Sequence, residues 1–110
     1  MAVIIFRKNF MYKYQVTTEY SYMEFGKLCA ERFDSNLRRI VDRLSKHPLS
    51  SPKEPWLMDV APHTYRSANI MKNWKIIYRY DETTDKVFLI DLWDMRRNTK
   101  TLVRIFKRIR

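Results

Sequence analysis

The sequence predicts an α+β fold with an N-terminal strand, a helical hairpin, an antiparallel β-meander and a basic C-terminal helix. Three observations lead to this prediction: a strand-like segment comes first, two helical segments follow it, and three further segments then alternate like strands. Strands and helices that are segregated along the chain in this way indicate the α+β class. A chain of 110 residues and 13.6 kDa has room for one domain, which we assign to residues 1–110.

The first half of the chain is expected to hold the first strand and both helices of the hairpin. Residues 12–17 alternate in side-chain character, as a half-buried strand does. Thr18 is a suitable N-cap for a helix that runs to about Phe33, where residues 34–35 (Asp-Ser) are expected to interrupt it. A second helix then ends at residues 46–48. Its apolar side chains fall at i, i+3, i+4 and i+7, the clearest helical stripe in the sequence: Leu37, Ile40, Val41 and Leu44.

The second half of the chain reads as a loop, a meander and a helix. Three prolines between residues 48 and 55 mark the loop. Strands are expected at residues 64–70, 74–80 and 87–93, and the last is apolar enough on both faces to lie centrally in the sheet. In the middle strand, Lys75 and Ile77 should share the face opposite to Tyr78. Thr99 is expected to cap the terminal helix, whose apolar side is formed by Leu102, Ile105 or Phe106, and Ile109.

Composition excludes several classes of protein. Hydrophobic residues make up 45% of the chain and aromatic residues 15%, which is too much apolar material for a disordered protein. A single glycine, Gly26, excludes a P-loop and a dinucleotide-binding fingerprint. Cys29 is the only cysteine, so we expect no internal disulfide and a reducing cytoplasmic location. The two histidines, the cysteine and the scattered acidic residues form no recognisable ligand spacing, so we expect no metal site, and we expect no cofactor. No segment approaches the roughly 20 apolar residues of a membrane span, so we expect a soluble protein with no membrane partner.

The charge of the chain indicates an anionic partner. Formal net charge is +10, from 22 Lys and Arg residues against 12 Asp and Glu residues. Such a charge attracts polyanions at long range and favours binding through counterion release. Residues 95–110 hold seven basic side chains and no acidic one: Arg96, Arg97, Lys100, Arg104, Lys107, Arg108 and Arg110. This clustering favours a functional basic surface on the terminal helix, either for phosphates or for an acidic segment of a partner protein.

Three segments of the meander together resemble the C-terminal half of the RelE/ParE superfamily of toxins. They are Tyr65-Arg66-Ser67, Asn73-Trp74-Lys75-Ile76-Ile77-Tyr78-Arg79, and residues 87–98, which end in Asp-Met-Arg-Arg-Asn. The resemblance implies the toxin of a type II toxin–antitoxin module, with a cognate antitoxin as partner. Within this superfamily some toxins cleave mRNA on the ribosome without a metal ion, and others poison DNA gyrase. The ending at residues 94–98 is similar to that of ParE-like and plasmid-stabilisation proteins.

By position, the resemblance places the basic catalytic cluster of the nuclease branch on Arg66, Lys75 and Arg96, with Arg97 in support. Fixed cations at these positions would stabilise the negative charge that develops on phosphorus during attack by a 2′-hydroxyl. The first hypothesis is therefore a ribosome-dependent mRNA endoribonuclease that binds RNA and inhibits translation. The alternative is a non-enzymatic inhibitor of DNA gyrase, and a third is an inert relative that binds nucleic acid. Leucine at position 102, where several nucleases of the superfamily carry a tyrosine, favours the gyrase inhibitor because leucine transfers no proton.

Further residues are candidates for nucleic-acid contact or for proton transfer. Tyr65 is the aromatic residue we select for RNA contact, and the basic side chains of the C-terminal segment complete the predicted nucleic-acid-binding set: Arg97, Lys100, Arg104, Lys107 and Arg108. His63 has the chemistry of a general acid or base, although a histidine next to a proline is more often a simple loop residue.

Overall fold

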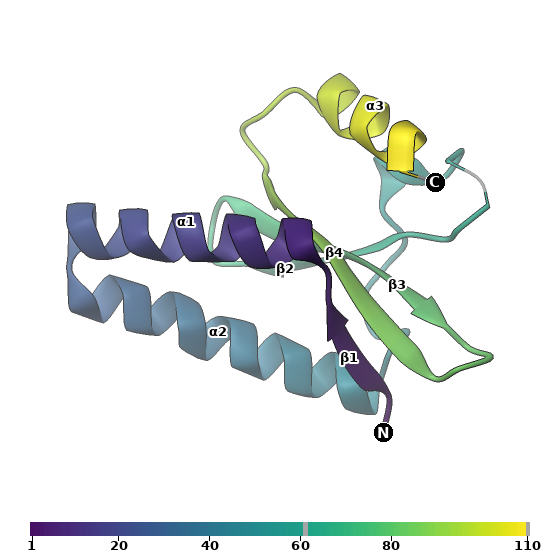
Figure 1. The fold of residues 1–110 in the computed structure, drawn as a ribbon, viewed down its shortest axis with the longest axis horizontal. Coiled ribbons are helices and arrows are strands. Elements are labelled where there is room, and N and C mark those ends of the chain that lie inside the picture. Colours follow the sequence, from purple (N-terminus) through teal and green to yellow (C-terminus); the bar gives the residue numbers. More distant parts are fainter. Residues whose placement is uncertain (61, 110) are drawn as a thin grey trace.

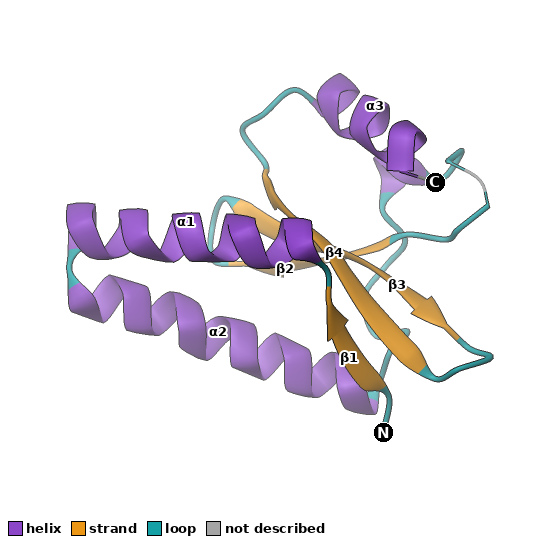
Figure 2. Cartoon of the chain, in the orientation of Figure 1, coloured by secondary structure: helices purple, strands orange, loops and turns teal. Residues whose placement is uncertain are grey.

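The computed structural model of the chain describes residues 1–60 and 62–109, and its elements follow the predicted order of strand, two helices, meander and helix (Figures 1 and 2). The elements are β1 (Val3–Phe6), α1 (Lys8–Phe25), α2 (Lys27–Lys46), a 3₁₀ turn η1 (Pro55–Leu57), β2 (Arg66–Ile70), β3 (Trp74–Asp81), β4 (Lys86–Asp94) and α3 (Thr99–Ile109). The α+β prediction is therefore confirmed. Among the described residues, no helix is both long and apolar enough to cross a membrane.

The four strands form one mixed sheet in the order β1-β4-β3-β2. Strands β2, β3 and β4 form the predicted antiparallel meander, and β1 adds to it in parallel along β4. The prediction that the last strand is central is confirmed, since β4 lies between β1 and β3. The ladder between β3 and β4 contains a bulge, because Tyr78 pairs with Leu89 whereas Ile77 pairs with Asp91. Ile90 is thus an extra residue of β4, inserted just before Asp91.

The prediction of a first strand at residues 12–17 is wrong, because these residues lie inside α1. Their alternation is a chance feature of a helix that is apolar on two sides. Phe10, Tyr14 and Thr17 follow each other at helical spacing on the inner side, where Phe10 and Thr17 are buried and Tyr14 packs against the core. The true first strand is the short apolar segment Val3–Phe6. Packing against the sheet overrides the strand preference of the aromatic and β-branched residues in this helix.

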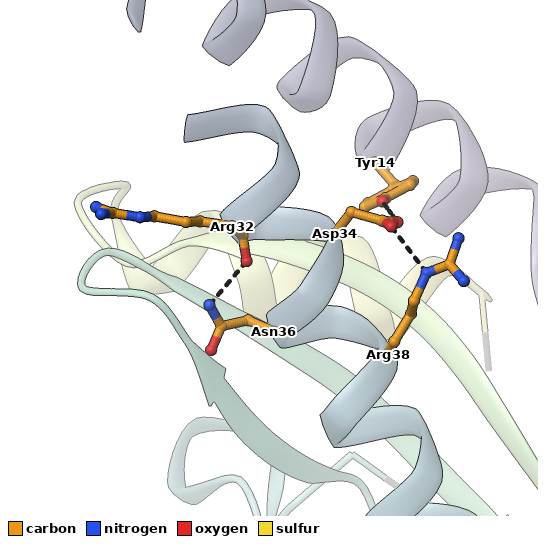
Figure 3. Close-up of polar contacts among 5 residues, drawn as sticks. All are labelled: Tyr14, Arg32, Asp34, Asn36 and Arg38. Atoms are coloured by element: carbon orange, nitrogen blue, oxygen red, sulfur yellow. Dashed lines mark hydrogen bonds and ion pairs between the residues drawn. The ribbon is translucent and has the colours of Figure 1, made fainter. Parts of the chain in front are cut away.

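The break between the two helices lies at Gly26 and not at Asp34. Gly26 adopts φ 89° and ψ 176°, a conformation that residues with a Cβ rarely adopt. Asp34 instead lies inside α2 and ties the two helices together (Figure 3). Its carboxylate accepts hydrogen bonds from the Tyr14 hydroxyl of α1 and, at 2.8 Å, from Nε of Arg38. Burial and the bond to Asp34 raise the pKa of Tyr14 to about 12, and the same bond lowers the pKa of Asp34. The predicted interruption at residues 34–35 and the predicted cap at Thr18 are therefore both wrong.

The helical hairpin covers one face of the sheet. Its predicted stripe is confirmed: Leu37 and Leu44 are buried, and Ile40 and Val41 pack against the same cluster. Figure 1 shows α1 and α2 side by side, with their turn far from the strands. The sheet contributes alternate side chains from all four strands to this core: Ile4, Ala68, Ile70, Trp74, Ile76, Tyr78, Tyr80, Val87, Leu89 and Leu92.

Helix α3 packs against the opposite face of the sheet. Leu102 and Phe106 are fully buried there against Ile77 and Trp93, as the predicted apolar side of the helix requires. Ile105 is partly buried, and the prediction for the Ile109 side chain lies outside the described residues. The helix is capped by Asn98 and not by Thr99, because Oδ1 of Asn98 accepts a hydrogen bond from the Lys100 backbone N–H at 2.9 Å. The sheet is thus a central layer with different partners on its two faces.

Candidate anion-binding cleft

The structure does not bring together the three basic residues that the resemblance selects. Arg66 pairs with Tyr78 and so lies on the hairpin side of the sheet, where Nη1 donates to the Ser51 carbonyl at 2.8 Å. Lys75 pairs with Trp93 and so lies on the α3 side. Arg66 and Lys75 therefore occupy opposite faces of the same sheet.

Lys75 and Arg96 are each bound to a carboxylate of the chain. Nζ of Lys75 lies 2.7 Å from Oε2 of Glu54, and their side chains are only 12% and 0% exposed. Arg96 forms a two-pronged pair with Asp94, with both nitrogen–oxygen distances at 2.9 Å. This pair raises the pKa of Arg96 and lowers that of Asp94, so both groups stay charged across the neutral range. These two cations are already neutralised within the protein.

Other basic side chains converge in a cleft of about 860 Å³ on the α3 side of the sheet, which we call the β4 cleft. Its walls come from the start of α1, the loop before β2, strands β3 and β4, and the segment that leads into α3. A cleft of this size is within the range that holds small ligands or a part of a polymer. The lining residues are Phe6, Arg7, Lys8, Asn9, Lys13, His63, Tyr65, Arg79, Ile90, Asp91, Arg97 and Ile105.

Two aromatic rings of β4 hold four of these cations in place. The guanidinium carbons of Arg7 and Arg79 lie 5.0 and 4.2 Å from the centre of the Phe88 ring. In the same way, Trp93 has Lys13 at 5.5 Å and Arg97 at 4.6 Å from its ring. Each such contact contributes about 0.5–1 kcal/mol at an exposed site. Four separate segments of the chain thus bring their positive charges to one strand.

A buried carboxylate lies between the two rings. Asp91 is fully buried, and its Oδ1 accepts from Nζ of Lys13 at 2.7 Å and from Nδ2 of Asn9 at 3.1 Å. Among the described residues, its Oδ2 has no hydrogen-bond partner. A buried charge is tolerated only with such partners, so Asp91 fixes the first turns of α1 against β4. One carboxylate does not balance the five Lys and Arg side chains of the cleft.

The start of α1 adds to the positive potential of the cleft. Lys8 and Asn9, which line it, are the first two residues of the helix, and there is no acidic residue in the first turn. Arg7 occupies the N-cap position, and no described side chain caps the helix there. An uncapped helix N-terminus carries a partial positive charge from its free backbone N–H groups. The local structure therefore favours an anionic ligand.

His63 and Tyr65 line the same cleft in different ways. Partial burial lowers the pKa of His63, and the nearby charges of Arg79 and Arg7 lower it further. The imidazole is therefore neutral at pH 7. Tyr65 is only 3% exposed and packs edge to face on Phe106 at 4.9 Å, so its ring has no free face for a base. Burial also raises the pKa of the Tyr65 hydroxyl.

Of the predicted nucleic-acid-binding residues, only Arg97 and the buried Tyr65 line the β4 cleft. The remaining ones are exposed on α3 and belong to a separate basic surface: Lys100, Arg104, Lys107 and Arg108. Alternation in β3 does place Arg79 on the α3 side, as the sequence indicates for this strand. Sequence reasoning did not identify Arg7 and Lys13 as site residues. Residues 12–17 were expected to form a strand, and no functional role was predicted for residues 1–9.

A comparison with models of known protein families finds one match. The family described as ParE toxin of type II toxin-antitoxin system, parDE, matches residues 4–99 of the chain. This match runs from the second residue of β1 to the first residue of α3. No curated protein matches the chain.

We predict that His63 titrates below the ordinary histidine pKa of 6.5 because of partial burial and the two neighbouring arginines. The Arg79→Gln variant should raise its pKa by removing the positive charge with the larger effect on it. NMR titration of the imidazole protons between pH 4 and about 8 measures both values. Arg104→Gln, on the exposed side of α3, is the matched control and should leave the titration unchanged. A pKa of 6.5 or above that does not respond to Arg79→Gln would contradict the described cleft.

Proposed function

Because the chain belongs to the ParE toxin family of type II toxin–antitoxin systems, we propose that it poisons its cell by inhibiting DNA gyrase and not by cutting RNA. Membership of the family implies a toxin with a cognate antitoxin as its partner. The choice of gyrase as the target rests on one observation: the basic residues selected by resemblance to the nucleases do not form a common site.

Phosphodiester cleavage needs cations that converge on one phosphate. Arg66 lies on the hairpin face and Lys75 on the opposite face, each bound to an acceptor of the protein. Leu102, at the position of the nuclease tyrosine, is fully buried on the side of α3 that packs against the sheet, and its side chain has no proton to transfer. These features support a toxin that acts by binding and without bond cleavage.

A second candidate is the ribosome-dependent endoribonuclease, and one observation favours it. His63 is neutral at pH 7 and lines the β4 cleft together with Arg7 and Arg79. A neutral imidazole beside guanidinium groups has the chemistry to take a proton from a 2′-hydroxyl while the cations hold the phosphate. This version of the nuclease hypothesis uses none of the three residues first selected.

The antitoxin needs a surface of its own, and we propose the outward side of the helical hairpin. Helix α1 is apolar on both sides, and its outer stripe is exposed: Met11, Tyr12, Val16, Tyr20 and Met23. Beside this stripe, a groove of about 590 Å³ runs between β1 and the hairpin, with Ile4, Phe6 and Val41 in its lining. Contiguous exposed apolar surface of this kind marks a protein interface. Membership of the family implies that the antitoxin is the partner, and an amphipathic segment of it would suit this apolar surface.

For the target, we predict that purified toxin inhibits supercoiling by gyrase at micromolar concentration. Induced toxin should stop growth without new mRNA ends at ribosomes, as primer extension would reveal. Arg66→Ala and Lys75→Ala are expected to retain inhibition as long as they stay folded, because neither residue lines the β4 cleft. Full supercoiling in the presence of toxin, together with mRNA cuts that disappear in His63→Ala, would replace the gyrase proposal with the nuclease candidate.

For the antitoxin, we predict that the double variant Tyr12→Glu/Val16→Glu binds it at least about tenfold more weakly, because burial of an unpaired charge is costly. Both side chains are exposed in the free toxin, so the variant should fold normally. Calorimetric titration with the protein encoded by the adjacent gene measures the affinity. The control, Arg104→Glu/Lys107→Glu on α3, should bind as wild type does. The opposite pattern would move the antitoxin to the basic helix.

A further inference from the structure

We propose that the β4 cleft binds the phosphate backbone of a single nucleic-acid strand, so that the toxin contacts DNA directly while it inhibits gyrase. The identity of that strand as DNA rests on the proposed function. The cleft itself does not, since its chemistry follows from the described side chains. The ligand class is a single-stranded phosphodiester chain, and the source, DNA or RNA, is separated by the experiment below.

The cations of the cleft are suited to phosphate. Three of them are arginines, Arg7, Arg79 and Arg97, whose planar guanidinium groups match pairs of phosphate oxygens. Each stacks on a ring of β4 at 4.2 to 5.0 Å, so the side chain is already ordered before a ligand arrives. Ordering before binding reduces the entropy lost on association.

The aromatic residues determine how a strand is recognised. Trp93 and Tyr65 are almost fully buried, and the Phe88 ring is occupied by two guanidinium groups. These three rings are therefore not free to stack on a base, whereas Phe6 and His63, which also line the cleft, are exposed. The cations contact the backbone of the ligand, and stacking of a base on an exposed ring does not distinguish one base from another, so binding should depend little on base sequence.

The volume of the cleft favours one strand over a duplex. Phe88 and Trp93 stand on β4, between the start of α1 and the segment that leads into α3, so their cations lie within the cleft. A flexible single strand can bring successive phosphates into a volume of about 860 Å³, whereas a rigid duplex meets only the rim. An acidic peptide is the competing occupant. Carboxylates on a flexible chain would use the same cations, so the test includes one.

Asp91 is the positioning residue of this site. It holds Lys13 and Asn9 through hydrogen bonds of 2.7 and 3.1 Å and thereby keeps the first turns of α1 beside β4. Its own negative charge is buried and paired with Lys13, so a phosphate in the cleft faces cations. The site is therefore formed by tertiary contacts between α1 and the sheet and not by a run of basic residues in the sequence.

The test is a binding titration of the full chain with three 12-nucleotide probes of equal sequence: single-stranded DNA, single-stranded RNA and duplex DNA. We expect both single strands to bind more tightly than the duplex. Arg79→Gln/Arg97→Gln should weaken single-strand binding at least about tenfold at low salt, as expected for lost charge-assisted contacts. Because each phosphate contact contributes about 0.7 to the salt slope for single strands, the slope should fall by roughly 1.4.

The matched control is Arg104→Gln/Lys107→Gln, which removes two charges from the exposed side of α3 and should change affinity less than threefold. Arg97→Gln alone covers the case in which Arg79→Gln disturbs folding, because Arg97 is exposed. Equal losses in the cleft and control variants would overturn the proposal, since they would reflect net charge only. So would tighter binding of a poly-glutamate peptide than of either single strand.

Two further outcomes separate this proposal from the gyrase proposal. Cleft variants that lose single-strand binding, in a toxin that never inhibits gyrase, would leave the cleft assignment standing and remove gyrase as the target. Cleft variants that bind single strands as wild type does would refute the cleft assignment, even if the toxin inhibits gyrase. Equal affinity for DNA and RNA identifies the backbone as the ligand, and a preference for RNA above tenfold would point to the ribosome as the source.

Discussion

The bulge in β4 and the buried carboxylate of Asp91 are the constraint on which the cleft depends. The extra residue Ile90 changes the register, so that Asp91 comes opposite Ile77 on the α3 side of the sheet. From there it reaches Lys13 and Asn9, and these contacts fix the beginning of α1 beside the sheet. A bulge that redirects one side chain beside a functional site is a recurrent device of β-sheets.

Once α1 is fixed in this way, positive charges accumulate with little internal compensation. The rings of Phe88 and Trp93 each accept two cations, which orders the side chains without neutralising them. The mutual repulsion of these cations destabilises the free protein, and an anionic ligand would relieve it. By contrast, Lys75 and Arg96 have carboxylate partners of their own and are better understood as structural ion pairs. Lys13 is likewise paired, with Asp91, whereas Arg7, Arg79 and Arg97 have no carboxylate partner within 4.0 Å among the described residues.

The sequence predicted the meander well and the site poorly, and both results have a physical reason. Alternation in β3 assigns Ile76 and Ile77 to opposite cores, because a strand between two packed layers must place alternate side chains in each. The same rule failed for residues 12–17, where a helix with two apolar sides imitates a strand. The cleft could not be read from spacing, since it joins residues 7 and 97 through a parallel pairing and a bulge. Neither leaves a local pattern in the sequence.

The most direct test of this account is an NMR titration of the arginine side-chain Nε–Hε resonances with a short single-stranded DNA. The account predicts progressive shifts of Arg7, Arg79 and Arg97, whose guanidinium groups line the β4 cleft. It also predicts no shift for Arg38, which lies on α2, is bound to Asp34 and does not line the cleft. Shifts confined to Arg104 and Arg108 of α3, with the three cleft arginines unchanged, would contradict it.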